Sequence, residues 1–252
     1  MTRPASTAMV FLDAARTGKL EMGRLPATLT LDQGLRTQID VLGLRTASGE
    51  ELGGWKVGLT SGPNRDRMGT GFRPFGYVLR SRIFRSGSEI SLGQLAPGAI
   101  EAELAFEIGR SLSGPDVTSS AAAAAIAGVR PAFELNQRRA PRPCDPGIQI
   151  ADDLSQWGIV IGDLRQWAPG REVTPVTLAR DSEPVETTGP DYAIDAPVLA
   201  LRRVCASLHR VGLGLEPGQQ VITGAFCRAT LDQPGEWAAT FSGAGTVRVR
   251  FS

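Results

Sequence analysis

The segment from Ile100 to Ile108 alternates between apolar side chains and mostly acidic ones, a period of two that is characteristic of a β-strand. Glu101 and Glu103 therefore project from the same face, about 7 Å apart at roughly 3.3 Å of rise per residue. Because like charges on one face repel each other, the pattern requires either open solvent or a positive partner. A solvated strand face and a site for one hard cation both meet that requirement.

The composition limits the partners that this chain can have. With 252 residues, 42% of them hydrophobic and 21% charged, it resembles an ordinary soluble protein of one large or two modest domains. The net charge of +1 gives no bulk attraction to nucleic acid or to an anionic membrane. No run of eighteen apolar residues and no apolar signal core occurs, and the three cysteines are widely spaced. We therefore expect a cytoplasmic protein with no nucleic-acid partner and no membrane partner.

Lysine is rare in this sequence. Of the 27 basic residues, only Lys19 and Lys56 are lysines. A lysine can change its protonation state in a confined site, whereas an arginine cannot. Biased arginine usage and chance also explain the low number, so Lys56 is a candidate only in combination with its surroundings.

Local signals divide the chain into a helical beginning and a strand-rich remainder. Residues 30–33 match a capping box, and Gly212 ends an amphipathic segment. We expect a helical N-terminal region over residues 1–50 and a β-rich catalytic domain over residues 51–252. Helices are expected at 5–16, 31–43, 119–127 and 197–211, and strands at 54–61, 77–84, 100–108, 129–135, 157–161, 219–223 and 245–251.

Two of the expected strands carry a charged residue away from their apolar face. Lys56 shares its face with Gly58 and Thr60. Small neighbours leave room for a ligand beside the amine, although glycine in a strand also marks a bulge. Glu134 projects in the direction opposite to Phe133 in the same way.

Arg138, Arg139 and Arg142 are expected to form a basic loop. Such a loop either binds an acidic group of a substrate or is simply solvated, and charge patterns of this kind favour the solvated loop. His209, the only histidine, is expected to be a packing or surface residue, because no acid or nucleophile motif accompanies it.

Five motifs occur in order along the chain. They are GWKVGLTS at 54–61, IEAELAF at 100–106, PAFE at 131–134, ADxxS at 151–155, and GLxxG at 214–218 leading to TG at 223–224. Together they resemble the 2-oxopent-4-enoate hydratase and 4-oxalocrotonate decarboxylase family, which belongs to the fumarylacetoacetate hydrolase superfamily. The resemblance extends from about Leu31 to Phe251.

This resemblance implies a divalent cation, usually Mg²⁺ or Mn²⁺, held by three carboxylates that fall on Glu101, Glu103 and Glu134. It also implies an active-site lysine, which falls on Lys56. The chemistry agrees, because oxygen ligands suit a hard octahedral ion, and the chain has too little histidine and no cysteine cluster for zinc. A small 2-oxo acid would chelate such an ion through its carboxylate and its 2-oxygen.

The reactions of the family imply roles for further residues. Lys56 is expected to donate or accept a proton, or to orient a carboxylate. Asp152 and Ser155 are candidates for orienting water or supporting the site, with a turn or helix-cap role as the alternative.

The implied activity is that of a magnesium-dependent lyase acting on a small unsaturated 2-oxo acid. Hydration of a 2-hydroxypenta-2,4-dienoate-like substrate is the leading expectation. The alternatives are decarboxylation of a 4-oxalocrotonate-like substrate, hydrolysis of a carbon–carbon bond in an acylpyruvate-like substrate, and a non-catalytic partner subunit. The presence of Glu101, Glu103, Glu134 and Lys56 together argues against the last alternative.

Four positions depart from the family pattern and bear on the choice of reaction. Pro74 stands where hydratases tend to have an acidic residue, and Asp153 stands where an asparagine is expected. Ala225 replaces a serine, and Glu107 adds a carboxylate on the acidic face.

For architecture, the resemblance implies an α+β fold, a mixed and mainly β roll with packed helices after a small helical N-terminal region. It also implies a homo-oligomer, with association with another enzyme of the same pathway as a further option.

Overall fold

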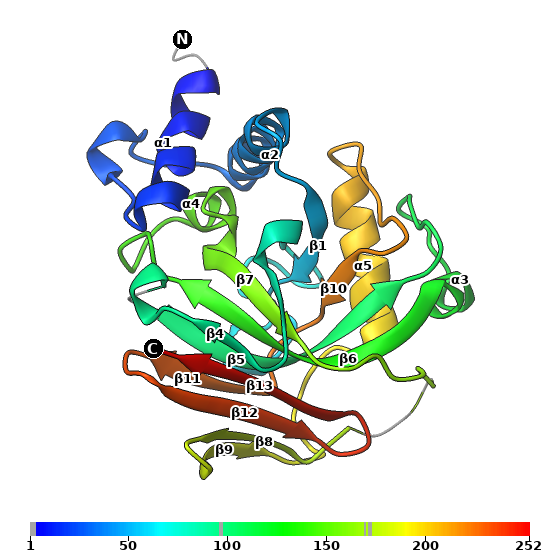
Figure 1. Ribbon diagram of the computed structural model, residues 1–252. Coiled ribbons are helices and arrows are strands. Elements are labelled where there is room, and N and C mark those ends of the chain that lie inside the picture. The colour runs from blue at the N-terminus through cyan, green and yellow to red at the C-terminus, as the bar shows by residue number, and fades with distance from the viewer. Residues whose placement is uncertain (1–3, 96–97, 169, 171–172) are drawn as a thin grey trace.

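The computed structural model describes residues 4–95, 98–168, 170 and 173–252 (Figure 1). The α-helices are α1 (Pro4–Thr17), α2 (Leu31–Ala47), α3 (Ser119–Ala125), α4 (Pro146–Ala151) and α5 (Pro197–His209). Short 3₁₀ turns are η1 (Met22–Arg24), η2 (Gly62–Asn64), η3 (Arg80–Arg82), η4 (Leu92–Gln94) and η5 (Asp153–Ser155). The strands are β1 (Leu52–Val57), β2 (Phe75–Leu79), β3 (Ile83–Arg85), β4 (Ser88–Ile90), β5 (Gly98–Ile108), β6 (Ile126–Gln137), β7 (Gln156–Ile161), β8 (Val176–Arg180), β9 (Glu183–Thr188), β10 (Gln220–Ile222), β11 (Cys227–Leu231), β12 (Gly235–Phe241) and β13 (Gly245–Phe251).

The strands form two open sheets. The larger has eight strands in the order β2-β1-β10-β5-β6-β7-β3, with β11 also paired to β5, and the smaller has five strands in the order β4-β13-β12-β8-β9. Each sheet contains parallel and antiparallel neighbours. The α+β class and the mixed, strand-rich character expected from the sequence are confirmed.

The two sheets pack face to face, as the lower half of Figure 1 shows. Alternate residues of β5 and β6, including Ile100, Phe106 and Phe133, are fully buried in this interface. They contact aromatic and β-branched residues of the small sheet, such as Trp237 and Phe251. This core uses up one face of β5 and β6, so Glu101, Glu103 and Glu134 must project from the opposite face.

The opposite face of the large sheet is concave and encloses a second, small apolar cluster. Strand β2 contacts β7 across the curve, although the two strands lie far apart in the sheet order. The cluster consists of Val78, Ala105, Ala132, Ile159, Ile161 and Ile222. Glu103 and Glu134 lie two residues from Ala105 and Ala132 on the same strands, and therefore on the same concave face.

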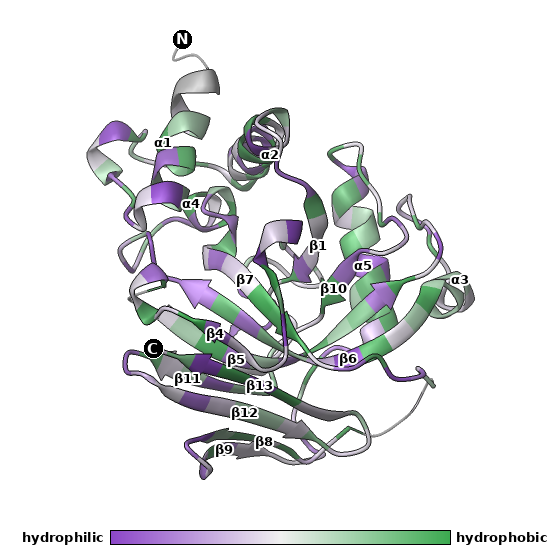
Figure 2. Cartoon of the chain, in the orientation of Figure 1, coloured by the Kyte–Doolittle hydropathy of each residue, from purple (hydrophilic) through white to green (hydrophobic). Residues whose placement is uncertain are grey.

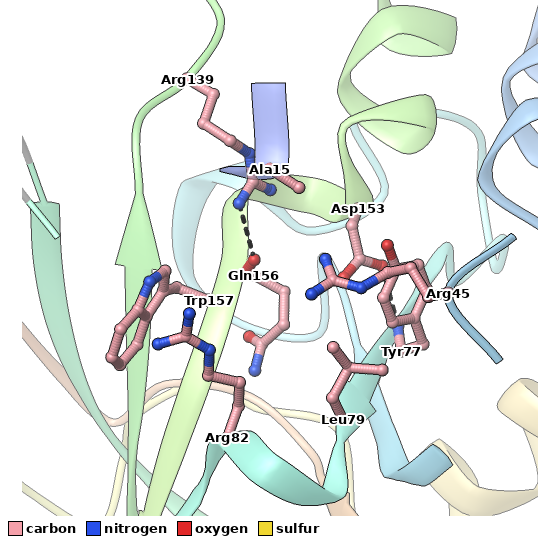
Figure 3. Close-up of a pocket in the computed structure, with 9 residues that line it drawn as sticks. All are labelled: Ala15, Arg45, Tyr77, Leu79, Arg82, Arg139, Asp153, Gln156 and Trp157. Carbon is pink, nitrogen blue, oxygen red and sulfur yellow. Dashed lines mark hydrogen bonds between the residues drawn. The ribbon is translucent and has the colours of Figure 1, made fainter. Parts of the chain in front are cut away.

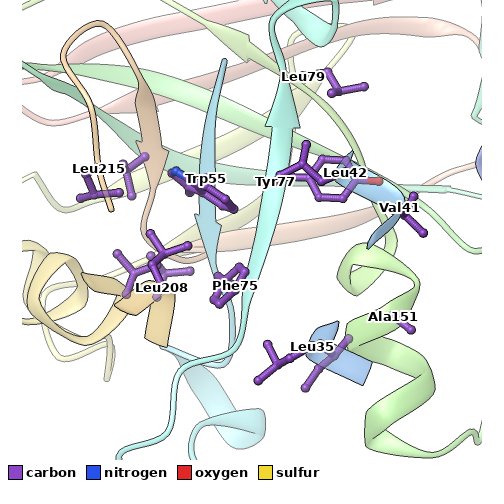
Figure 4. Packing of buried hydrophobic residues seen from close by; sticks show 14 of the residues in the cluster. Leu35, Val41, Leu42, Trp55, Phe75, Tyr77, Leu79, Ala151, Leu208 and Leu215 are labelled. Atoms are coloured by element: carbon purple, nitrogen blue, oxygen red, sulfur yellow. The ribbon is translucent and has the colours of Figure 1, made fainter. Parts of the chain in front are cut away.

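Helices cover β1 and β2 through a third apolar cluster (Figure 4). Trp55 and Phe75 meet edge to face at 5.5 Å between ring centroids, and both are fully buried. Leu35 of α2 and Leu208 of α5 belong to the same cluster. Figure 2 shows hydrophobic stretches along β6 and β7 and on α5, in agreement with these layers. Each large side chain buried here contributes about 1.5–3 kcal/mol to stability.

The N-terminal helices share this third cluster with the sheet. Helix α2 begins at the expected capping box: Gln33 donates its backbone N–H to Thr30 Oγ1 at 3.2 Å, and Thr30 N–H donates to Gln33 Oε1 at 2.9 Å. The helix continues four residues beyond the expected end at Gly43 and ends at Ala47. None of the described helices has both the length and the hydropathy needed to cross a lipid bilayer.

The expectation of one strand over 77–84 is wrong. The chain forms β2, then the turn η3, then β3, which pairs with β7 at the other edge of the sheet. The curvature of the sheet brings its two edges close enough for three residues to connect them, a long-range effect that local periodicity does not contain. Strands β4, β8, β9, β11 and β12 and helix α4 were also not predicted.

Candidate metal centre and active site

Three carboxylates gather on the concave face because of the register of two long strands. Glu101 of β5 lies directly opposite Glu134 of β6, and Glu103 lies opposite the small Ala132. One oxygen atom of each of Glu101, Glu103 and Glu134 lies within 4.8 Å of the others. Like charges in directly opposed positions destabilise a sheet, so this arrangement requires a strong positive partner.

Burial makes the repulsion more severe. Glu103 and Glu134 are each only 2% exposed, and Glu101 is half-buried. Burial, followed by the charge of Glu134, raises the pKa of Glu101 to about 7. The same two causes, with Glu101 in addition, raise the pKa of Glu103 well above its ordinary value. A divalent cation would remove this strain, because it favours the ionised form of all three groups.

Lys56 of β1 points into the same cluster. Its Nζ donates hydrogen bonds to Glu134 Oε1 and, at 3.0 Å, to the carbonyl oxygen of Leu154. Gly76, opposite Lys56 on β2, leaves the space for this side chain, since a Cβ there would lie 2.8 Å from Lys56 Cγ. Burial alone would lower the pKa of Lys56, but Glu134 and Glu101 outweigh it, so that the pKa is raised and the ammonium form is favoured.

Two further groups hold the carboxylates in position. Gly224 donates its backbone N–H to Glu103 Oε2 at 2.8 Å. Gly224 has a φ of +124°, and a Cβ there would lie 1.9 Å from Thr60 Oγ1, so only glycine fits. Arg228 of β11 lies opposite Glu101, with 3.2 Å between Arg228 Nε and Glu101 Oε1.

A cavity of about 520 Å³ opens in front of these groups. Its walls come from the segment after β1, from β5 and β6, from the turn at 154–155, and from the loop before β11. Its polar lining includes Lys56, Glu101, Glu103, Glu134, Asn136, Ser155, Tyr192, Arg67, Arg138, Arg142, Gln149 and Arg228. The arrangement can therefore bind a small anionic molecule beside a cation.

Asp152 and Ser155 have different surroundings. Asp152 is 3% exposed, accepts a hydrogen bond from Arg139 Nε at 2.7 Å, and is not part of the cavity lining. Ser155 does line the cavity, where its Oγ lies 3.4 Å from Arg142 Nη2. Residues 153–155 all have left-handed backbone angles, with φ values of 53°, 50° and 67°. This unusual turn directs the carbonyl of Leu154 toward Lys56.

The four positions that depart from the family pattern are also separated in space. Ala225 lines the cavity, but Pro74 and Glu107 do not. Pro74 accepts the backbone hydrogen bond of Gly58 at 2.8 Å. Glu107 accepts hydrogen bonds from Arg130 at 2.7 Å and Gln220 at 3.2 Å, so its charge is compensated away from the carboxylate cluster.

Asp153 faces a second, much smaller cavity of about 30 Å³ (Figure 3). Its Oδ1 accepts hydrogen bonds from Tyr77 N–H and from Gln38 Nε2, both at 2.8 Å. Burial raises the pKa of Asp153 to about 8, although these hydrogen bonds act in the opposite direction. The carboxyl group is therefore neutral in the folded protein below that pH.

Replacing Asp153 by asparagine is expected to stabilise the protein near neutral pH. The folded state keeps a proton on Asp153 that the unfolded state releases above about pH 4, so the stability falls as the pH rises from about 4 to 8. Asparagine keeps the accepting oxygen and avoids this cost, which is on the order of 2 to 4 kcal/mol at pH 7. Thermal denaturation at pH 5 and pH 8 would show a gain that grows with pH. Asp163→Asn, at an exposed position, is the control, and a loss of stability in Asp153→Asn at both pH values would contradict the prediction.

The expectation of a solvated basic loop is wrong for Arg139. Arg139 is 7% exposed and donates to the carboxylate and to the carbonyl oxygen of Asp152. It also donates to the carbonyl oxygen of Gln156 (Figure 3). Its guanidinium group is satisfied inside the protein because its fixed fork of donors matches these acceptors. Arg138 and Arg142 remain exposed.

Sequence reasoning did not identify several residues of the large cavity. Asn136 follows Glu134 by two residues and so shares its face, a signal that the strand period contains. Its Oδ1 lies 3.4 Å from Lys56 Nζ. Arg67, Gln149, Tyr192 and Arg228 come from other segments, and no local pattern links them to the carboxylates.

The donor set fits a hard divalent cation. Three carboxylates supply only oxygen ligands, as Mg²⁺, Mn²⁺ and Ca²⁺ prefer, and no cysteine or histidine lies among the residues that line the cavity. Three protein ligands also leave positions for a substrate. The residues present therefore fit a catalytic cation better than a closed structural site.

Comparisons with known proteins agree with this fold. No family model matches the sequence. A 2-hydroxyhexa-2,4-dienoate hydratase of Comamonas testosteroni is 25% identical over 234 residues, 89% of this chain and 87% of the relative. A 4-oxalocrotonate decarboxylase of Pseudomonas sp is 26% identical over 209 residues, 82% of this chain and 81% of the relative.

The structure of 4-oxalocrotonate decarboxylase from Pseudomonas putida G7, complexed with magnesium and adipate, has the same fold, with a TM-score of 0.89. It is 21% identical, and the match covers 99% of this chain and 97% of the other. The sequence relatives and the structural match therefore confirm the resemblance to the 2-oxopent-4-enoate hydratase and 4-oxalocrotonate decarboxylase family that the sequence motifs indicated.

Proposed function

We propose that this protein is a divalent-metal-dependent lyase that acts on a small unsaturated 2-oxo acid. Hydration of a 2-hydroxypenta-2,4-dienoate-like substrate is its leading reaction. The observation that carries the proposal is the cluster of Glu101, Glu103 and Glu134, with Lys56 hydrogen-bonded to it, in the wall of a cavity large enough for such a substrate.

Glu101, Glu103 and Glu134 would hold the cation, with Mg²⁺ or Mn²⁺ as the proposed ion. When bound, the cation supplies Lewis-acid stabilisation of negative charge on the 2-oxygen of the substrate. The backbone N–H of Gly224 keeps Glu103 in a fixed orientation, and Arg228 does the same for Glu101.

Lys56 is the proposed proton donor. Its ammonium form is favoured, and its Nζ is fixed between Glu134 and the carbonyl of Leu154. Addition of water to a conjugated dienol requires protonation of carbon, which a positioned acid accelerates. Ser155 is proposed to orient water in the cavity. Asp152 acts indirectly, because its ion pair with Arg139 supports the turn that holds Leu154 and Ser155.

Decarboxylation of a 4-oxalocrotonate-like substrate is the second candidate, because loss of carbon dioxide delivers electrons to the same 2-oxygen. Pro74, in place of the acidic residue expected in hydratases, favours it. Hydrolysis of an acylpyruvate is less well supported, since the only histidine, His209, is exposed in the last turn of α5 and is not part of the cavity. A cytoplasmic location is proposed on the basis of the three widely spaced cysteines, and a homo-oligomer on the basis of the family resemblance.

Ultraviolet absorbance tests these reactions directly. The protein is mixed with 2-hydroxypenta-2,4-dienoate or 4-oxalocrotonate and Mg²⁺, with and without a chelator. We expect loss of one chromophore that stops when the chelator is added. Turnover of neither compound would contradict the proposed reactions, and turnover that survives chelation would contradict the role of the metal.

A further inference from the structure

The mouth of the large cavity carries more positive charge than the proposed chemistry needs. Arg67, Arg138 and Arg142 line the cavity in addition to Arg228, which is paired with Glu101. Among the residues that the structure describes, no carboxylate lies within ion-pair distance of Arg67, Arg138 or Arg142. These three arginines therefore have no acidic partner in the protein itself.

Arg67 and Arg142 are held in place by a buried amide. Gln149 of α4 is 8% exposed, and its Nε2 donates to the carbonyl of Cys144 at 2.8 Å, which fixes the direction of the amide. Gln149 Oε1 then lies 2.7 Å from Arg67 Nη2 and 3.5 Å from Arg142 Nη1. Two guanidinium groups from distant segments thus converge on one neutral acceptor, which orients them without compensating their charge.

The charges at the acidic end of the cavity balance without Arg67, Arg138 and Arg142 once the 2-oxo acid end of a substrate is bound. The three glutamates face Lys56, Arg228 and, in the proposed enzyme, a divalent cation, which leaves one positive charge. The carboxylate next to the 2-oxo group of the substrate cancels that charge. The positive charges of Arg67 and Arg142 remain for another anionic group.

The guanidinium group of Arg142 lies close to Lys56, the proposed proton donor. Lys56 contacts the carbonyl of Leu154, and the next residue, Ser155, contacts Arg142 through its hydroxyl at 3.4 Å. Lys56 and Arg142 both line the cavity of about 520 Å³. Positive neighbours also disfavour the charge of Arg142: burial lowers its pKa, and Arg67 and Arg228 lower it further. A bound carboxylate would relieve this repulsion.

We propose that Arg67 and Arg142, oriented by Gln149, form a subsite for a second carboxylate at the far end of the substrate, so that the preferred 2-oxo acid is a dicarboxylate. This inference rests on the proposed function at the 2-oxo acid end of the substrate, and within that function it favours a dicarboxylate over the monocarboxylate 2-hydroxypenta-2,4-dienoate. It assigns chain-end specificity to two arginines that take no part in the proton transfer.

Two unreactive acids that share the 2-oxo acid end test the subsite. Calorimetry in the presence of Mg²⁺ compares 2-oxopentanoate with 2-oxohexanedioate, which carries the additional carboxylate. We expect the wild type to bind the diacid about tenfold or more tightly than the monoacid. Arg67→Gln and Arg142→Gln should each weaken diacid binding by about tenfold and leave monoacid binding within about twofold. Arg110→Gln, at an exposed position outside the cavity, is the control and should change neither.

The outcomes separate this inference from the proposed function. Equal affinity of the wild type for both acids would overturn the subsite alone. Equal losses for both acids in the arginine variants would also overturn it, because they would place the guanidinium groups on the shared carboxylate. If neither acid binds in the presence of Mg²⁺, the proposed function fails, and the inference fails with it.

Discussion

Replacing Glu103 by glutamine is expected to weaken divalent metal binding by about 100-fold or more and to leave the fold intact. Changes in the groups around a metal ligand already cost roughly 10- to 100-fold in affinity, so loss of one of three charged ligands should cost at least as much. Glutamine has nearly the same volume, and its amide oxygen can still accept the hydrogen bond from Gly224 N–H. Calorimetric titration with Mg²⁺ and Mn²⁺ measures the loss.

The metal-free protein distinguishes loss of a ligand from loss of the fold. Burial and the charges of Glu134 and Glu101 raise the pKa of Glu103, so removal of this charge should preserve or raise the melting temperature. Glu107→Gln is the matched control, because Glu107 lies on the same strand and pairs with Arg130 outside the cluster. Undiminished metal affinity in Glu103→Gln would show that the site is assigned wrongly.

Replacing Lys56 by methionine is expected to lower kcat by about 100-fold or more at saturating metal. A positioned proton donor contributes about 10²- to 10⁴-fold to a rate. Metal affinity should be unchanged or higher, because a positive charge is removed from beside the three carboxylates. Opposite effects on turnover and on metal binding would separate a role in catalysis from a role in building the site.

The metal-free form of this variant should be less stable. The methionine leaves the buried Glu134 without its hydrogen-bonded cation, and loss of one partner of a buried ion pair costs about 3–5 kcal/mol. Activity is therefore compared only with metal bound. Lys19→Met is the control, since Lys19 is the only other lysine and is exposed. If Lys56→Met retained most of its kcat, Lys56 would be a positioning residue and not the proton donor.

A raised pKa has opposite implications at the two cavities. At Asp153 burial outweighs the two hydrogen bonds and the charges of Arg139 and Lys56, and the group stays neutral below about pH 8. At Glu101 and Glu103 the fit to a divalent cation explains why the repulsion is tolerated. The same burial therefore costs stability at one site and prepares the other for a ligand.

The sequence by itself determined the fold class, the family resemblance and the identity of the central acidic strand. These properties depend on local sequence patterns. The period of two along Ile100–Ile108 requires Glu101 and Glu103 to share a face. The capping box at Thr30 favours the start of a helix whatever the tertiary contacts of the segment are. The rarity of lysine, together with the small neighbours Gly58 and Thr60 on the same strand face, made Lys56 a candidate. The ordered motifs then related these residues to one family.

Only the tertiary structure decided which side chains meet. Lys56 and Glu134 are 78 positions apart, and their contact depends on the curvature of a sheet whose order does not follow the chain. The burial of Arg139 against Asp152 and the convergence of Arg67 and Arg142 on Gln149 depend on α4, which the sequence analysis did not predict. Periodicity fixes the direction of a side chain relative to its own strand, but the partner that it reaches is set by packing between distant segments.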